Sequence, residues 1–166
     1  MKDDVKYFGL FVDGRGYVGE CSGYTPPELT LQTKSKRGGG MDVGVAVDMG
    51  MEDLSVSFKL HSYSRDVLAL WGLVRNGRVP VTVRGALEDG DGVVTQVRHL
   101  TRGLITQVRE GEWTPGGGTE LTFTQRCDFY ERRHGDEVIH RIDAENMVRI
   151  VDGVDQLAEH RKAIGR

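Results

Sequence analysis

The chain has 166 residues and a mass of 18.4 kDa, which fits one domain. Its 22 Lys+Arg and 25 Asp+Glu give a net charge of -3 with both signs interspersed, so the charge excludes a basic surface that grips nucleic acid. Its 23 glycines, about twice the usual share, follow no collagen period and indicate many turns between many short strands.

The N-terminal region predicts a β-hairpin. An apolar run over 7–12 ends at the turn signal of residues 13–16, and a second strand is expected to begin at Tyr17. After two prolines, apolar and polar residues alternate over 28–36. This alternation predicts a strand with one face packed on a core and the other in contact with water or a polar partner.

The next segment predicts a long arm or loop. Three cations within 34–37 are followed by three glycines, and such a run does not hold a rigid element by itself because glycine loses the most conformational entropy on ordering. Strand alternation resumes over 45–47 and again over 54–60.

Only two segments predict helices. Ser64 is placed to cap the first, and Trp71 lies on its apolar stripe and is expected in the core. The second is expected to be capped by Asp152, to run from Val154, and to end at Gly165.

Long strands are expected between the helices. They run over 79–87, 93–108, 119–133 and 137–143. The second would span about 50 Å at ~3.3 Å per residue. Either a bulge at Gly103 divides it, or the strand extends beyond its own domain. Long amphipathic strands expose edges that invite pairing with other chains, so they suit a barrel closed by several subunits.

The chemical motifs give no catalytic, metal or cofactor site. The GxGxxG pattern at 14–19 lacks the helix that a dinucleotide site needs, and the Asp-Gly-Asp-Gly turn at 89–92 lacks the spacing of a calcium loop. Cys21 and Cys127 match no metal or redox spacing and are expected to be reduced and partly buried. We therefore expect no enzyme and no cofactor.

Three ordered stretches, 9–19, 39–52 and 145–158, resemble the major tail tube protein family of contractile-tailed phages; the tube subunits of R-type bacteriocins are similar. Weaker agreement elsewhere keeps the same order, so the resemblance covers nearly the whole chain. One departure is Thr25-Pro-Pro-Glu28-Leu, where the family tends to read Leu-Pro-Lys-Leu.

The resemblance implies a mainly β fold: a single tail-tube domain over 1–166, built as a β-sandwich or partial barrel with one or two short helices. Six copies would form a ring whose strands join an inner β-barrel. Stacked rings would form a hollow tube that conducts DNA in a phage or ions in a bacteriocin. The segment over about 34–50 would be the assembly arm. Its candidate residues are Lys34, Lys36, Arg37, Gly38, Gly39, Gly40, Met41 and Asp42.

The implied partners are further copies of the chain and the sheath, tape-measure, baseplate and tail-terminator proteins. DNA would be only cargo in the lumen, and no membrane insertion is expected. The implied location is the virion tail or bacteriocin particle, assembled in the bacterial cytoplasm. The alternatives are a tube protein of another contractile injection system and a monomeric ligand-binding β-barrel. The sequence leaves open whether the particle carries DNA and which strand faces line the lumen.

Overall fold

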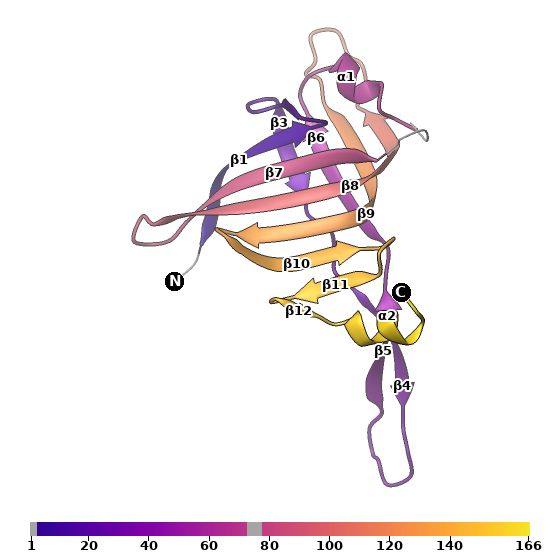
Figure 1. Ribbon diagram of the computed structural model, residues 1–166. Helices are drawn as coiled ribbons and strands as arrows, with labels where there is room; N and C mark the ends of the chain where they lie inside the picture. The colour runs from indigo at the N-terminus through magenta and orange to yellow at the C-terminus, as the bar shows by residue number, and fades with distance from the viewer. Residues whose placement is uncertain (1–2, 73–77) are drawn as a thin grey trace.

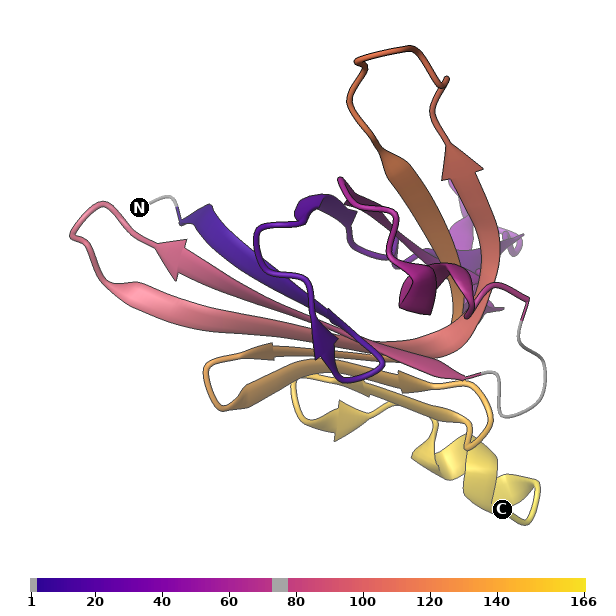
Figure 2. The same ribbon diagram turned by 90° about the horizontal axis from the view of Figure 1, so that it is seen from above.

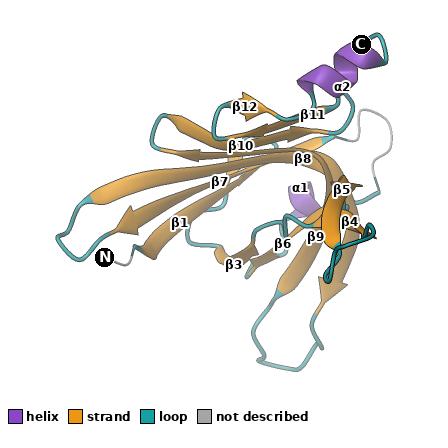
Figure 3. Cartoon of the chain, turned by 90° about the horizontal axis from the view of Figure 1, so that it is seen from below, coloured by secondary structure: helices purple, strands orange, loops and turns teal. Residues whose placement is uncertain are grey.

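The computed structural model describes residues 3–72 and 78–166 as a mainly β chain with two short helices, which confirms the predicted fold class (Figure 3). The first six strands are β1 Asp4–Val12, β2 Arg15–Gly16, β3 Cys21–Thr25, β4 Leu31–Lys36, β5 Val45–Met51 and β6 Leu54–Leu60. The remaining strands are β7 Val79–Glu88, β8 Val94–Glu110, β9 Leu121–His134, β10 Glu137–Asp143, β11 Val148–Val151 and β12 Val154–Asp155. The helices are α1 Arg65–Leu68 and α2 Ala158–Ala163. Neither helix has the length or apolar character needed to cross a membrane.

The long strands β8 and β9 belong to two parts of one antiparallel sheet. In the broad part the strand order is β12-β11-β10-β9-β8-β7-β1-β2. In the narrow part the first half of β9 pairs with β6 on one side and with the second half of β8 on the other, and β6 pairs with β3. Figure 2 shows β8 and β9 bending between the two parts, with α1 and β3 lying in the angle that they enclose.

The bend coincides with the predicted bulge. The register of β8 on β9 shifts between Arg102 and Gly103 and again between Ile105 and Gln107. Bulges increase local twist and re-aim a strand. A Cβ atom added to Gly103 would collide with the carbonyl oxygen of Arg126, so only glycine lets the two strands approach so closely.

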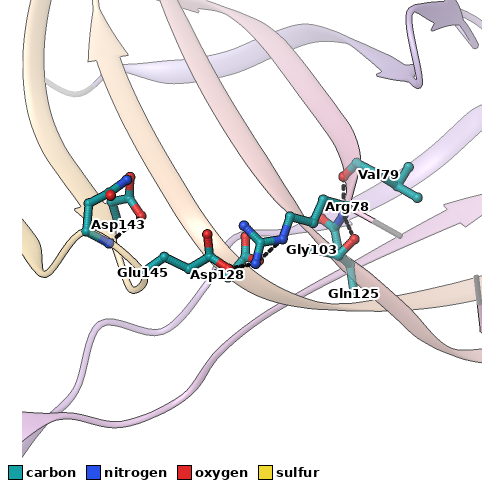
Figure 4. A network of polar contacts seen from close by, with 8 residues as sticks. Arg78, Val79, Gly103, Gln125, Asp128, Asp143 and Glu145 are labelled. Atoms are coloured by element: carbon teal, nitrogen blue, oxygen red, sulfur yellow. Dashed lines mark hydrogen bonds and ion pairs between the residues drawn. The ribbon is translucent and has the colours of Figure 1, made fainter. Parts of the chain in front are cut away.

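A buried glutamine crosslinks the strands at this bend (Figure 4). Gln125 is fully buried, and its Nε2 donates to the carbonyl oxygens of Val79 at 2.6 Å and Gly103 at 3.3 Å. Its Oε1 accepts a hydrogen bond of 2.8 Å from the Thr101 hydroxyl. Because buried polar groups need partners, this satisfied network favours one arrangement of β7, β8 and β9.

The main core fills the angle between the two parts. On β6, Leu54, Val56, Phe58 and Leu60 are buried and alternate with more exposed residues, as the sequence predicts. The rings of Phe58 and Phe123 stack across β6 and β9 with centroids 5.1 Å apart. The largest cluster of buried side chains comprises Leu10, Val12, Tyr17, Phe58, Leu60, Val67, Val79, Val81, Val83, Ile105, Leu121 and Phe123.

The first hairpin differs from the prediction in where its second strand begins. Asp13 and Gly14 both have positive φ, +50° and +80°, which matches a tight two-residue hairpin turn. Strand β2 therefore begins at Arg15. Tyr17, the expected start, is a buried residue whose carbonyl oxygen accepts hydrogen bonds from the backbone of Glu20 and Cys21.

The first helix is shorter than predicted, and the expectation that Trp71 lies in the core is wrong. Helix α1 ends at Leu68, so Trp71 lies beyond the helical stripe and is 57% exposed. Its indole Nε1 donates to the carbonyl oxygen of Thr106 on β8 at 3.0 Å. Ser64 precedes the helix but makes no side-chain cap; its hydroxyl lies 3.1 Å from that of Tyr17.

The C-terminal helix starts later than predicted, at Ala158 instead of Val154. Asp152 does not cap it, because Asp152 and Gly153 form the positive-φ turn between β11 and β12. The carboxylate of Asp155 accepts the backbone N–H of Leu157 at 3.1 Å instead. Gly165 follows the helix at φ +83°, as expected of a glycine that ends a helix.

Candidate functional site

Strands β4 and β5 form a separate two-stranded hairpin that extends away from the sheet (Figure 1). We name residues 31–51 the arm hairpin. All six residues of β4 are exposed, so the prediction that one face of 28–36 packs on a core is wrong within a single subunit. The reason is topological, because in the described part of the chain β4 is paired only with β5.

The predicted arm residues lie together on this hairpin. Lys34 and Lys36 belong to β4, and residues 37–42 form the tip. Arg37 Nε donates to the carbonyl oxygen of Met41 at 2.9 Å, and Gly40 has φ +85°. The predicted loop is therefore an ordered hairpin with a defined turn. It exposes the apolar side chains of Leu31, Met41, Val43, Val45 and Met49.

An ion pair fixes the base of the arm hairpin to the broad part of the sheet. Arg149 on β11 is 9% exposed and pairs with the carboxylate of Asp48 on β5. The hydrogen bond from Arg149, followed by one from the backbone N–H of Gly50, holds the pKa of Asp48 below its ordinary value. This contact limits rotation of the hairpin about its base.

The narrow part of the sheet has two open edges among the described residues. β3 is paired only with β6, and β8 beyond Gly103 is paired with no strand except β9; on this part of β8 the carbonyl oxygens of Ile105 and Thr106 accept hydrogen bonds from the Gly72 backbone and the Trp71 indole. Beside this β8 edge lies an open groove lined by Leu68, Trp71 and Val108. Unpaired strand edges are templates for pairing with another chain, and an exposed tryptophan next to one is a typical interface anchor.

The face of the narrow part that points away from the core is rich in hydroxyl groups. Ser57 lies opposite Thr124, and Lys59 lies opposite Thr122. Three cations lie on this face: Lys59 pairs with Glu120 at 3.3 Å, Arg126 pairs with Asp53, and Arg109, directly opposite Thr122, has no ion pair within the described residues. The alternation of serine with core residues over 54–60 is the sequence signal that could have revealed this face.

His99 and the two cysteines are buried or half-buried, which shifts their pKa values. Burial lowers the pKa of His99 to about 4, and its Nδ1 lies 3.0 Å from the Tyr24 hydroxyl. Cys21 and Cys127 are unpaired and half-buried, as predicted, and burial raises the pKa of Cys127 to about 12. Over 3–72 and 78–166, no three histidine, cysteine or acidic side chains are grouped to hold a metal ion.

Comparison with known sequences points to assembly. The family model described as "Phage tail tube protein FII" matches residues 2–165. The tail tube protein of Escherichia phage P2 is 30% identical over 169 residues, covering 99% of this chain and 98% of that protein. The major tail tube protein of Serratia phage KSP20 is 27% identical over 151 residues, covering 90% of this chain and 87% of that protein.

Solved structures share the fold at low sequence identity. A chain from the sheath–tube complex of an extracellular contractile injection system, PVC, superposes with a TM-score of 0.60 at 10% identity and covers 80% of this chain and 92% of its own. A chain from the anti-feeding prophage cap that terminates its tube gives a TM-score of 0.61 at 9% identity, covering 81% and 93%. At these identities the likeness concerns the fold alone.

Proposed function

The chain belongs to the phage tail tube protein FII family, the tube proteins of contractile tails, and from this premise we propose that it assembles into hexameric rings that stack into a hollow tube. The tube would conduct DNA in a phage, or ions in a bacteriocin, when the sheath contracts. The protein would act as a structural subunit without catalysis, and its rings would form in the host cytoplasm.

The observation that carries this proposal is the pair of open edges on the narrow part of the sheet. An edge on β3 and another on β8 lie at opposite ends of the same four strands. If β3 of one copy pairs with β8 of the next, each copy donates one edge and receives one. Such a head-to-tail contact closes into a ring when the rotation between copies fits, and closure removes both edges.

The hydroxyl-rich face of the narrow part is the proposed lining of the channel. A polyanion adheres to a wall that offers unpaired cations, because each phosphate contact adds to binding. Lys59 and Arg126 are already neutralised by carboxylates, and serine and threonine lie beside them, so Arg109 is the one cation of this face without an ion pair in the described part of the chain. A wall of this kind permits DNA to slide along it.

The arm hairpin is the proposed contact between stacked rings or neighbouring subunits. Its exposed apolar residues make no core contacts in the single subunit, its strand β4 carries Lys34 and Lys36, and its tip carries Arg37 and Asp42. Contact with a neighbour would bury this surface. By family membership, the sheath, baseplate, tape-measure and terminator proteins are the further proposed partners.

Electron microscopy and sedimentation of the purified full-length chain test the proposal. We expect rings or tubes that increase with protein concentration. A species that stays at 18.4 kDa at high concentration, with no polymer even after tube fragments are added as seeds, would refute it.

Deletion of Arg37 to Gly40 tests the arm separately. The deletion shortens only the tip, so the subunit should keep its circular dichroism spectrum and form rings that stack poorly. The matched control is Asp91→Ser in the exposed turn between β7 and β8, which leaves the arm hairpin intact. Normal tubes from the deletion variant would remove the arm from the assembly contacts.

A further inference from the structure

We infer that two surfaces on opposite sides of the subunit form a head-to-tail contact between copies of this chain: an arginine-rich face of the broad part, and the acidic loop 110–120 between β8 and β9. This contact would add to the strand pairing of the proposed ring, and it depends on that ring. The arginine face is defined by Arg84, Arg98, Arg102, Arg133 and Arg141, on the side of the sheet that points away from the core.

Strand register brings three of these arginines side by side. Arg84 on β7 lies directly opposite Arg98 on β8, and Arg98 lies directly opposite Arg133 on β9. Neighbouring strands are about 4.8 Å apart, and like charges in directly opposite positions destabilise a sheet. A row of three therefore opposes the folding of an isolated subunit.

One carboxylate of the described residues pairs with these arginines, and it is fully used. Glu131 is 6% exposed and accepts hydrogen bonds from the Nε atoms of Arg133 and Arg141, the latter at 2.9 Å. Burial alone would raise the pKa of Glu131, but these two hydrogen bonds lower it overall. The carboxylate thus neutralises one end of the row only.

The other three guanidinium groups have no carboxylate partner within 3–72 and 78–166. The Arg84 guanidinium lies 5.3 Å from the centre of the Phe11 ring, and that of Arg102 lies 4.4 Å from the Phe129 ring. Arg98 has a buried Nε without a hydrogen-bond partner. Guanidinium groups bind carboxylates in a two-pronged geometry, so this face is complementary to an acidic surface.

The composition of the face favours a protein over a nucleic acid. Half-buried Phe11, Leu100 and Phe129 lie between the arginines, and arginine with aromatic side chains is the mixture enriched in protein interfaces. Unpaired arginines on a channel wall would also hold DNA phosphates and oppose transport. We therefore place this face against another subunit.

The loop 110–120 supplies the complementary chemistry. It carries Glu110 and Glu112, and its Trp113 is 77% exposed. The Trp113 indole donates to Glu110 at 3.2 Å, and its ring packs edge-on against Tyr63. Glu112 is exposed and has no ion pair in the described part of the chain. A held tryptophan beside carboxylates has the features of an interface anchor.

The two surfaces point in opposite directions, as a head-to-tail contact requires. Figure 2 shows the loop between β8 and β9 extending from the side of the broad part on which α1 and β3 lie. The arginine face is on the other side, because Val83 is in the core and its neighbour Arg84 points away from it. Each copy can therefore receive one loop and offer its own, which is the pattern that closes a ring.

Charge reversal tests the contact with two variants, Arg98→Glu and Glu112→Arg, in the full-length chain. Arg98→Glu places a carboxylate between Arg84 and Arg133, so the monomer should melt at the same temperature or higher. Each variant alone should need at least about tenfold more protein to form rings, because one face and one loop then carry like charges. An exposed residue of α2 provides the control, Lys162→Glu, which makes the same charge change as Arg98→Glu and should assemble normally.

The deciding measurement is the protein concentration at which a mixture of the two variants forms rings. In an equimolar mixture of the two variants, acidic loops meet arginine faces and basic loops meet glutamate faces, so alternating rings should form near the wild-type concentration. The chain that carries both substitutions should form rings near the wild-type concentration without a second variant. Normal assembly of Arg98→Glu alone, or failure of both the mixture and the double variant, would overturn the contact while wild-type rings still support the proposed function. A wild-type chain that forms no rings would instead overturn the proposed function.

Discussion

Replacement of Gln125 by leucine tests whether the bend of β8 and β9 is held by the buried network. Leucine has a similar volume, so the packing is largely kept, but the hydrogen bonds to Val79, Gly103 and Thr101 are lost. A buried polar group left without its partner costs about 1–3 kcal/mol.

The distances indicate how this cost is distributed. The 2.6 Å bond to Val79 is the strongest, the 3.3 Å bond to Gly103 is weak, and the Thr101 hydroxyl keeps a contact of 3.4 Å with the carbonyl oxygen of Val81. We therefore expect the free energy of unfolding to fall by about 2–4 kcal/mol, and not by the sum of three full penalties.

Urea unfolding followed by circular dichroism measures this loss at concentrations below assembly. The matched control is Gln107→Leu on the neighbouring strand β8, where the side chain is exposed and the change should stay within about 0.5 kcal/mol. If Gln125→Leu lost no more stability than Gln107→Leu, the network would not hold the bend, and close packing around Gly103 would have to do so.

Three further predictions concern the bend, the edge and the interior. Gly103→Ala should lower the free energy of unfolding by at least about 2 kcal/mol, measured by urea unfolding, because the new methyl group meets the backbone of Arg126. Trp71→Ala should lower the free energy of unfolding of the monomer by less than about 1.5 kcal/mol in the same assay, since the side chain is 57% exposed. The same change should weaken ring formation beside the β8 edge. A loss of about 3–5 kcal/mol would show that Trp71 belongs to the core. His99 has a folded pKa of about 4 against an ordinary 6.5, so the unfolded chain binds the proton first and stability should fall as the pH drops from about 6.5 to 4; His99→Phe should flatten that part of the melting-temperature profile.

Features that depend on neighbouring residues in the sequence could be predicted. The turn at 89–92 forms because the Asp89 carboxylate accepts two backbone N–H groups just ahead of it, and the Gly103 bulge follows from a strand too long to stay regular. The alternation over 54–60 predicted the buried face of β6 correctly. In each case the physical cause lies within the segment itself.

Features set by distant pairing could not be predicted. The arginine row exists only because β7, β8 and β9 align in one register, and residues 84, 98 and 133 show no pattern along the chain. The start of α2 was misplaced for a related reason. An Asp-Gly pair is as suitable for a tight turn as an aspartate is for a helix cap, and the pairing of β11 with β12 selects the turn.

The two wrong burial predictions share one cause. The alternation on β4 and the apolar stripe ending at Trp71 both predict a face packed on the core, but β4 and Trp71 are exposed in the single subunit. An apolar pattern indicates that a face will be buried, but it does not distinguish burial within the same chain from burial against another chain. Exposed apolar residues on the arm hairpin and beside an open strand edge are therefore more consistent with contacts between copies than with a monomeric barrel.

The ordered arm hairpin also changes the energetics of docking. An unstructured arm would lose about 1–2 kcal/mol of backbone entropy per residue when it docks. Most of the arm hairpin is already ordered before docking, by the backbone pairing of β4 with β5, by the Arg37–Met41 hydrogen bond at the tip and by the Asp48–Arg149 ion pair at its base. An isolated two-stranded hairpin is only marginally stable in water, so the ion pair should matter to docking more than its local energy suggests. Arg149→Met should therefore leave the sheet folded while the arm becomes mobile and stacking weakens; hydrogen exchange of β4 and β5 that stayed as slow as in the wild type would show that the hairpin holds without its base.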